Sequence, residues 1–242
     1  MGLGIIILDD VYPGFPGDVR NASAYPFPIQ YEIAEGVDIQ KLVREDNKEE
    51  LLKPVLTAAR KLERMGCRAI AAECGYFAWF QKEIAAAVNV PVFASSLLQV
   101  PVFASSLLQV PFAQTIIGAD KVVGILAAES DQLYDRHLTS VGVQLGSNYV
   151  VDGAKDNGKC PQFDSLWNED VRPDTPTADY SSAEQDIISA AKSFAASHPK
   201  MGAMVLECTG FQPFARAIQR EIDMPVFSWS TLLDYAYSIA AH

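Results

Sequence analysis

Apolar and polar positions are arranged along the chain in blocks that predict alternating strands and helices. Short continuous apolar runs at Gly4–Leu8 and Arg68–Ala72 have the length of buried strands, and residues 48–65 between them have the pattern of a helix. The same order returns later as a strand, a helix and a strand: Lys121–Leu126, Ser182–His198 and Ala203–Leu206. Continuous apolar strands that alternate with helices predict an α/β protein whose parallel sheets carry helices on both faces.

One segment of the chain is a copy of another. Residues 73–98 align without a gap onto residues 207–232, and ten positions are identical. The identical pairs are Glu73/Glu207, Cys74/Cys208, Phe77/Phe211, Phe80/Phe214, Ile84/Ile218, Pro91/Pro225, Val92/Val226, Phe93/Phe227, Ser96/Ser230 and Leu98/Leu232. Two copies predict a duplicated half-domain with a pseudo-twofold axis and a cleft between the halves, because a solenoid needs more repeats. We expect an N-terminal half at 1–112, a C-terminal half at 113–219, and a segment at 220–242 that packs back on the first half.

A shorter repeat is of another kind. Pro91–Val100 is followed at once by the identical Pro101–Val110. Ten residues turn a helix by about 280°, so two helical copies would not keep one buried stripe. We expect one copy to be displaced, as a loop or irregular structure after the third strand. A tandem duplication or an error in the sequence record is favoured over a functional role.

A second irregular segment lies in the C-terminal half. Residues 152–180, rich in Gly, Pro and Asp, predict a long loop, either a lid or a disordered or oligomer-contacting segment.

Charge and cysteine spacing narrow the classes of function. The net charge is -11 and no cluster of Lys or Arg is present, which argues against nucleic acid and anionic membranes as partners. The first residues lack the basic flank and the length of a signal peptide, so a cytoplasmic location is expected. The four cysteines form no Cys-x-x-Cys pair and have no metal-like spacing with the three histidines, so no metal site and reduced thiols are expected.

The duplicated motif carries the candidate chemistry. Cys74 and Cys208 each follow an apolar strand and precede a turn into a helix. Ligands of parallel sheets bind outside the carboxyl ends of the strands, and a helix start favours a thiolate. The pseudo-twofold axis would place the two thiols face to face, where one abstracts a proton and the other donates one. Backbone N–H groups that follow the cysteines are candidates to hold a carboxylate: Gly75, Tyr76, Thr209 and Gly210.

Other side chains near strand ends are weaker candidates. Asp10 follows the first strand, where a loop could contact substrate, although a solvated turn is the favoured explanation. Glu73 and Glu207 precede the cysteines and should point away from the cleft, so a structural ion pair or a capping role is predicted for them. The hydroxyl groups that are candidates to bind a carboxylate belong to Ser95, Ser130 and Thr209.

On these motifs the chain resembles the aspartate/glutamate racemase superfamily. The resemblance covers nearly the whole chain, including Pro16–Asn21 after the first strand and Val90–Gln99. It implies cofactor-independent chemistry by a cysteine pair on a small carboxylate substrate, without pyridoxal phosphate or metal, in a homodimer or larger homo-oligomer. Amino-acid racemases of the group carry Asn-Thr after the first cysteine and Gly-Cys-Thr-Glu at the second. This chain has neither, and is more similar to hydantoin racemases, arylmalonate decarboxylases, maleate isomerases and algal dimethylsulfoniopropionate lyases.

Three functions are compatible with the sequence. The first is a racemase or epimerase that inverts a carbon next to a carboxylate or carbonyl group. The second is a lyase or decarboxylase of the same superfamily, in which one cysteine moves the proton and the other has a lesser part. The third is a non-catalytic protein that closes on a small anion. Product analysis separates the first two, and thiol reactivity separates both from the third.

Overall fold

The computed structural model describes residues 2–11, 14, 16–88, 102–156, 159–167 and 179–240. Ser95 and the first copy of the decapeptide lie outside these residues. Within the part of the chain that the structure describes, no helix is both long enough and apolar enough to cross a membrane.

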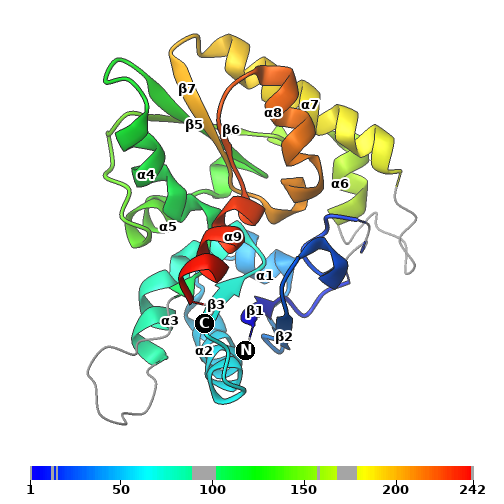
Figure 1. The fold of residues 1–242 in the computed structure, drawn as a ribbon, viewed down its shortest axis with the longest axis vertical. Coiled ribbons are helices and arrows are strands. Elements are labelled where there is room, and N and C mark those ends of the chain that lie inside the picture. Colours follow the sequence, from blue (N-terminus) through cyan, green and yellow to red (C-terminus); the bar gives the residue numbers. More distant parts are fainter. Residues whose placement is uncertain are drawn as a thin grey trace.

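The strands form two parallel sheets with the same strand order. The first sheet runs β2-β1-β3-β4 and the second runs β6-β5-β7-β8. The strands of the first are β1 (Leu3–Ile7), β2 (Ile29–Ile33), β3 (Ala69–Ala72) and β4 (Val102–Phe103). Those of the second are β5 (Val122–Ala127), β6 (Tyr149–Gly153), β7 (Met201–Leu206) and β8 (Val226–Phe227). The predicted fold class, two pseudo-symmetric parallel-sheet halves with flanking helices, is confirmed, and Figure 1 shows the halves one above the other.

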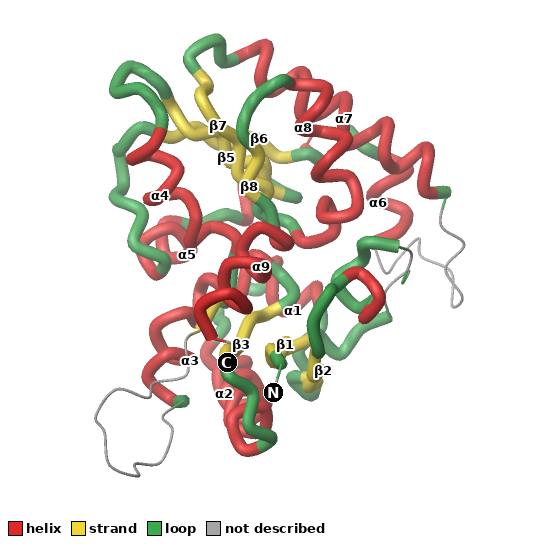
Figure 2. Tube along the Cα trace, in the orientation of Figure 1, coloured by secondary structure: helices red, strands yellow, loops and turns green. Residues whose placement is uncertain are grey.

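Helices cover both sheets (Figure 2). They are α1 (Ile39–Arg44), α2 (Glu49–Arg64), α3 (Gln81–Ala87), α4 (Gln109–Ile116), α5 (Asp135–Ser140), α6 (Pro161–Trp167), α7 (Tyr180–Ser197), α8 (Ala215–Ile222) and α9 (Trp229–Ala240). The sequence of α2 explains its fold: Leu51, Val55 and Leu62 share one buried face, while acidic residues start the helix and basic residues end it, as the helix dipole favours.

The last helix crosses from the second half to the first. Trp229, Leu233 and Ala236 of α9 are buried in one cluster with Leu3 and Ile5 of β1. Figure 1 shows α9 in red descending from the upper half beside the lower sheet, near the point where both ends of the chain lie. The C-terminal helix therefore ties the two halves together.

The second copy of the decapeptide supplies the fourth strand. Val102 and Phe103 form β4 and pair with Ile70 and Ala71 of β3. The sequence alignment had assigned this place to the first copy, so the extra ten residues belong to the connector between α3 and β4. That connector spans residues 88–101, whereas the equivalent one between α8 and β8 spans only 223–225.

The segment predicted as one long loop contains regular structure, so that prediction is wrong for its described part. Gly153 ends β6, and residues 161–167 form α6. The carboxylate of Asp186 on α7 accepts hydrogen bonds from the backbone N–H groups of Gln162 (2.7 Å) and Phe163 (3.2 Å) at the start of α6. Phe163 is buried against Phe211 with ring centroids 5.0 Å apart. This short helix brings an aromatic ring to the edge of the site.

Candidate active site

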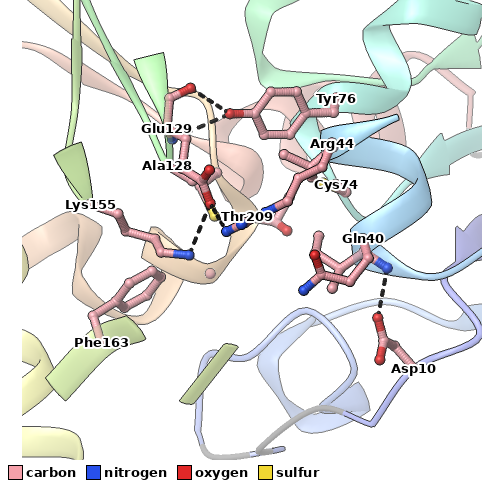
Figure 3. A pocket seen from close by; sticks show the side chains of 14 residues that line it. Asp10, Gln40, Arg44, Cys74, Tyr76, Ala128, Glu129, Lys155, Phe163 and Thr209 are labelled. Carbon is pink, nitrogen blue, oxygen red and sulfur yellow. Dashed lines mark hydrogen bonds and ion pairs between the residues drawn. The ribbon is translucent and has the colours of Figure 1, made fainter. Parts of the chain in front are cut away.

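Both cysteines of the duplicated motif line one pocket between the halves. Cys74 and Tyr76 come from the first half, and Cys208, Thr209 and Gly210 come from the second (Figure 3). The strands β3 and β7 end two residues before the cysteines, so the equivalent strand ends of the two sheets meet at this pocket. The structure thus brings together the two thiols that the sequence singled out.

Backbone N–H groups approach the sulfur atoms. A 3-10 helix follows each cysteine, η2 (Gly75–Phe80) after Cys74 and η6 (Thr209–Phe214) after Cys208. The N–H group of Tyr76 favours the thiolate of Cys74, and those of Gly210 and Phe211 favour the thiolate of Cys208. Two of the four N–H groups predicted to hold a carboxylate, those of Tyr76 and Gly210, therefore face the cysteines.

Burial nevertheless dominates the thiol equilibria. It raises the pKa of Cys208 to about 12 and the pKa of Cys74 well above its ordinary value, and the carboxylate of Glu207 adds to both shifts. The Lys155 ammonium and two N–H groups oppose the shift at Cys208. The sequence favoured thiolates at the helix starts, and the structure reverses that expectation because desolvation outweighs the helix dipole. Of the two thiols, Cys208 has more groups that stabilise its anion.

A cluster of charged side chains that the sequence analysis missed forms one wall of the pocket. The Glu129 carboxylate accepts ion pairs from Arg44 (3.0 Å) and Lys155 (3.1 Å), and Lys155 also contacts Asp164 (2.6 Å). The Tyr76 hydroxyl donates to the backbone carbonyl of Glu129 (2.8 Å). Figure 3 shows Arg44 and Lys155 approaching Glu129 from opposite sides. Glu129 and Lys155 each lie two residues after a strand, β5 and β6. Had β6 been predicted from the sequence, Lys155 would have been a candidate as a residue at a strand end. Arg44 ends the short helix α1, and no sequence pattern marked it as a site residue.

The weaker candidates have different places. Asp10 lines the pocket, and its carboxylate accepts a hydrogen bond from the N–H of Ile39 at the start of α1 (2.9 Å). Ser130 does not line this pocket; its hydroxyl donates to the carboxylate of Asp156. Ser95 lies outside the described residues.

Gly75 and Thr209 occupy equivalent positions at the contact between the halves. The Thr209 hydroxyl donates to the backbone carbonyl of Glu73, so it is already engaged. Gly75 does not line the pocket; a Cβ atom there would overlap the carboxylate and the carbonyl oxygen of Glu207. Each motif therefore touches the glutamate of the other half.

The two glutamates are fully buried and differ in their partners. Glu73 receives two hydrogen bonds from the guanidinium group of Arg20 (2.8 and 2.7 Å) and one from the N–H of Leu8 (2.7 Å). Glu207 accepts one bond from the N–H of Ala128 (3.3 Å), and its Oε1 atom has no partner among the described residues. Burial raises the pKa of Glu207 to about 8. The predicted ion pair is present at Glu73, whereas among the described residues Glu207 has none.

Metal ligands do not gather in the described part of the chain. Across residues 2–240, with the gaps given above, no three side chains of His, Cys, Asp or Glu are placed to hold a metal ion together.

The sequence of this chain is similar to those of known lyases. No family model matches the chain. A dimethylsulfoniopropionate lyase of Durusdinium sp. clade D is 27% identical over 239 residues, which cover 96% of this chain and 73% of that protein. Dimethylsulfoniopropionate lyase 3 of Emiliania huxleyi (strain CCMP1516) is 25% identical over 233 residues, or 93% of this chain. The chain spans only 56% of the length of this second relative.

Solved structures share the architecture over almost the whole chain. Arylmalonate decarboxylase matches with a TM-score of 0.58 and 13% identity, covering 98% of this chain and 92% of that one. An aspartate racemase homologue from Pyrococcus horikoshii OT3 matches with a TM-score of 0.54 and 16% identity, covering 100% and 99%. Allantoin racemase from Pseudomonas fluorescens matches with a TM-score of 0.53 and 14% identity, covering 98% and 90%. This likeness shows that the chain has the fold of arylmalonate decarboxylase and of these racemases, while its sequence is similar to dimethylsulfoniopropionate lyases.

Proposed function

We propose that this protein is a lyase that cleaves dimethylsulfoniopropionate or a closely similar sulfonium carboxylate. The sequence relatives named as such lyases match 93% and 96% of the chain, which favours the lyase alternative over the racemase that the sequence analysis put first. The chain is shorter than these relatives, so the activity of the whole relatives is carried over here as a proposal.

The observation that carries the proposal is a pair of thiols in one pocket, Cys74 buried and Cys208 partly exposed, whose ionisation a bound cation would favour. Desolvation raises the pKa of both Cys74 and Cys208, so both thiols are protonated at neutral pH. A sulfonium group bound beside them supplies a positive charge, which favours the thiolate. The pocket also offers a carboxylate, Glu129, and the aromatic rings of Tyr76 and Phe163, all of which suit an organic cation.

The opposite end of such a substrate is a carboxylate. Arg44 and Lys155 line the same pocket, and a substrate carboxylate would share these cations with Glu129. The side chain of Lys155 is only 13% exposed, so an ion pair there is weakly screened by solvent. A substrate with a carboxylate at one end and a sulfonium at the other therefore has complementary groups for both ends.

The proposed reaction is a β-elimination with Cys208 as the base. Its thiolate takes a proton from the carbon next to the substrate carboxylate, and the C–H electron pair forms a double bond to the next carbon. The bond from that carbon to sulfur breaks, and its electron pair leaves with neutral dimethyl sulfide, so that acrylate remains. The proton on Cys208 then passes to solvent. Cys208 is chosen over Cys74 because Lys155 and two N–H groups favour formation of its thiolate.

Incubation with dimethylsulfoniopropionate tests the proposal directly. We expect equal amounts of dimethyl sulfide, measured in the headspace, and acrylate, measured by liquid chromatography, with Cys208→Ser as the matched inactive control. The lyase assignment would be refuted if a folded protein, with thiols that react with iodoacetamide, formed neither product.

A racemase is the second candidate, because two cysteines at equivalent positions line one pocket. It predicts that deuterium from solvent enters a carbon next to a carboxylate without bond cleavage. It also predicts that Cys74→Ser and Cys208→Ser abolish activity equally. An anion-binding protein predicts instead that ligand binds with neither product formation nor isotope exchange.

A further inference from the structure

The carboxyl group of Glu207 lies between the two cysteine motifs. It belongs to the residue before Cys208, and it packs against the backbone of Gly75, the residue after Cys74. The side chain is fully buried and does not line the substrate pocket. Its Oε2 atom accepts a hydrogen bond from the N–H of Ala128, and its Oε1 atom has no partner among the described residues. No substrate contact or packing role explains a free carboxyl oxygen here.

The titratable groups that the structure describes around Glu207 include no cation paired with it. Tyr76 faces it from η2, Cys74 and Cys208 face it from the positions just before η2 and η6, and Glu129 faces it from the loop after β5. The nearby cation Lys155 is paired with Glu129 and Asp164. Each of the facing groups is neutral or anionic, so an ionised Glu207 would add negative charge beside the thiols.

The pKa values of these groups agree with this geometry. Burial raises the pKa of Glu207 to about 8, and its ionised form raises the pKa of both Cys74 and Cys208. The carboxyl and the thiols are therefore coupled, and each resists ionisation of the other.

We propose that Glu207 is a positioning residue that competes with the Cys74–Cys208 pair for the single negative charge that the buried site accommodates. The proposal rests on the thiol chemistry of the proposed function. While Glu207 keeps its proton, a thiolate forms without a carboxylate beside it. Once Glu207 has lost its proton to solvent, the charge is already in place and a thiolate forms much less readily.

This competition predicts a particular pH dependence. Below pH 8 the thiolate population should rise tenfold with each pH unit, as for any thiol below its pKa. Above pH 8 the proton is lost from Glu207 instead, so the thiolate population should level off. Removal of the carboxyl should abolish this break.

The test compares Glu207→Gln with wild type and with the matched variant Glu73→Gln. The rate at which iodoacetamide modifies Cys74 and Cys208 is followed from pH 6 to 10 by peptide mass spectrometry. We expect a break near pH 8 in wild type and in Glu73→Gln, and a continued rise in Glu207→Gln. At pH 9, one unit above the break, Glu207→Gln should react about tenfold faster than wild type. A break that persists in Glu207→Gln would overturn the proposal.

Infrared titration of the folded protein keeps the proposal testable if Glu207→Gln does not fold. A carbonyl band of a buried protonated carboxyl should persist at pH 7 and vanish around pH 8 in the Glu73→Gln background. Asp18 titrates lower, since burial raises its pKa only to about 6. Absence of the band at pH 7 would refute the proposal. Neither measurement uses substrate, so failure to cleave dimethylsulfoniopropionate would remove the proposed function alone.

Discussion

The two Glu-Cys motifs have the same sequence and opposite electrostatic surroundings. In the N-terminal half, the Glu73 carboxylate is paired with Arg20 and bonded to the N–H of Leu8. In the C-terminal half, Glu207 has one backbone donor and no paired cation within the described part of the chain. Arg20 comes from the loop after β1, a segment that lies outside the duplicated stretch. The duplication therefore copies the strand and the turn that position each cysteine, while the loops particular to each half decide its charge.

The largest expected effect is the difference in activity between the two cysteine variants. Cys208→Ser removes the proposed base, and loss of a general base lowers rates by about 10²–10⁴-fold. Cys74→Ser should reduce the initial rate of dimethyl sulfide release less, by a margin of at least about tenfold, because Lys155 and two N–H groups stabilise the Cys208 thiolate. Circular dichroism would check that both variants are folded. Equal losses would show that the halves act symmetrically, as in a two-base racemase.

Glu207 should make the stability of the protein depend on pH. The pKa of Glu207 rises from 4.5 to about 8 on folding, so the folded state binds more protons than the unfolded state between these values. Its contribution to stability is complete below pH 4.5 and is lost as the pH rises to 8, by about 3 to 5 kcal/mol. Glu207→Gln should lack this loss. Urea unfolding at pH 5, 7 and 9 measures the free energy of unfolding for both proteins.

Glu73→Gln is the control for this experiment. It breaks a buried ion pair with Arg20, so it should destabilise the protein by about 3 kcal/mol even where Glu207→Gln stabilises it. If both variants change the free energy of unfolding in the same direction at pH 9, the contrast between the halves is wrong.

The features that the sequence predicts well are those carried by local patterns. The strands β1, β3, β5 and β7 are continuous apolar runs, and the duplicated motif marks Cys74 and Cys208 as equivalent. The ion pairs of Arg44 and Lys155 with Glu129 are not local: Arg44 and Glu129 lie in different halves. Identical decapeptides also leave the sequence no basis for choosing which copy forms β4. Finally, burial raises the pKa values of both thiols, and the sequence does not show this burial because it depends on how the two halves pack against each other.

Substitutions at Gly75 and Thr209, where the two halves touch, should change the stability by a smaller amount. A Cβ atom in Gly75→Ala would overlap the carboxylate and carbonyl oxygens of Glu207, and overpacking of this kind costs about 1–3 kcal/mol. The equivalent change, Thr209→Ala, only removes a hydroxyl that donates to the Glu73 carbonyl, at a cost of about 1 kcal/mol. Thermal unfolding of the two variants compares them. A neutral Gly75→Ala would mean that the halves separate easily at this point.

The connectors after α3 and α8 give the smallest expected effect. Residues 88–101 join α3 to β4 with fourteen residues, whereas residues 223–225 join α8 to β8 with three. Removal of either decapeptide copy produces the same protein, because the copies are identical, and leaves a connector of four residues. If the longer connector makes no contacts of its own, its closure costs about 1 kcal/mol more than that of the short one. The shortened chain should therefore keep its thiol reactivity and gain about 1 kcal/mol in urea unfolding. A loss of stability would instead show that the additional decapeptide contributes contacts that the C-terminal half does without.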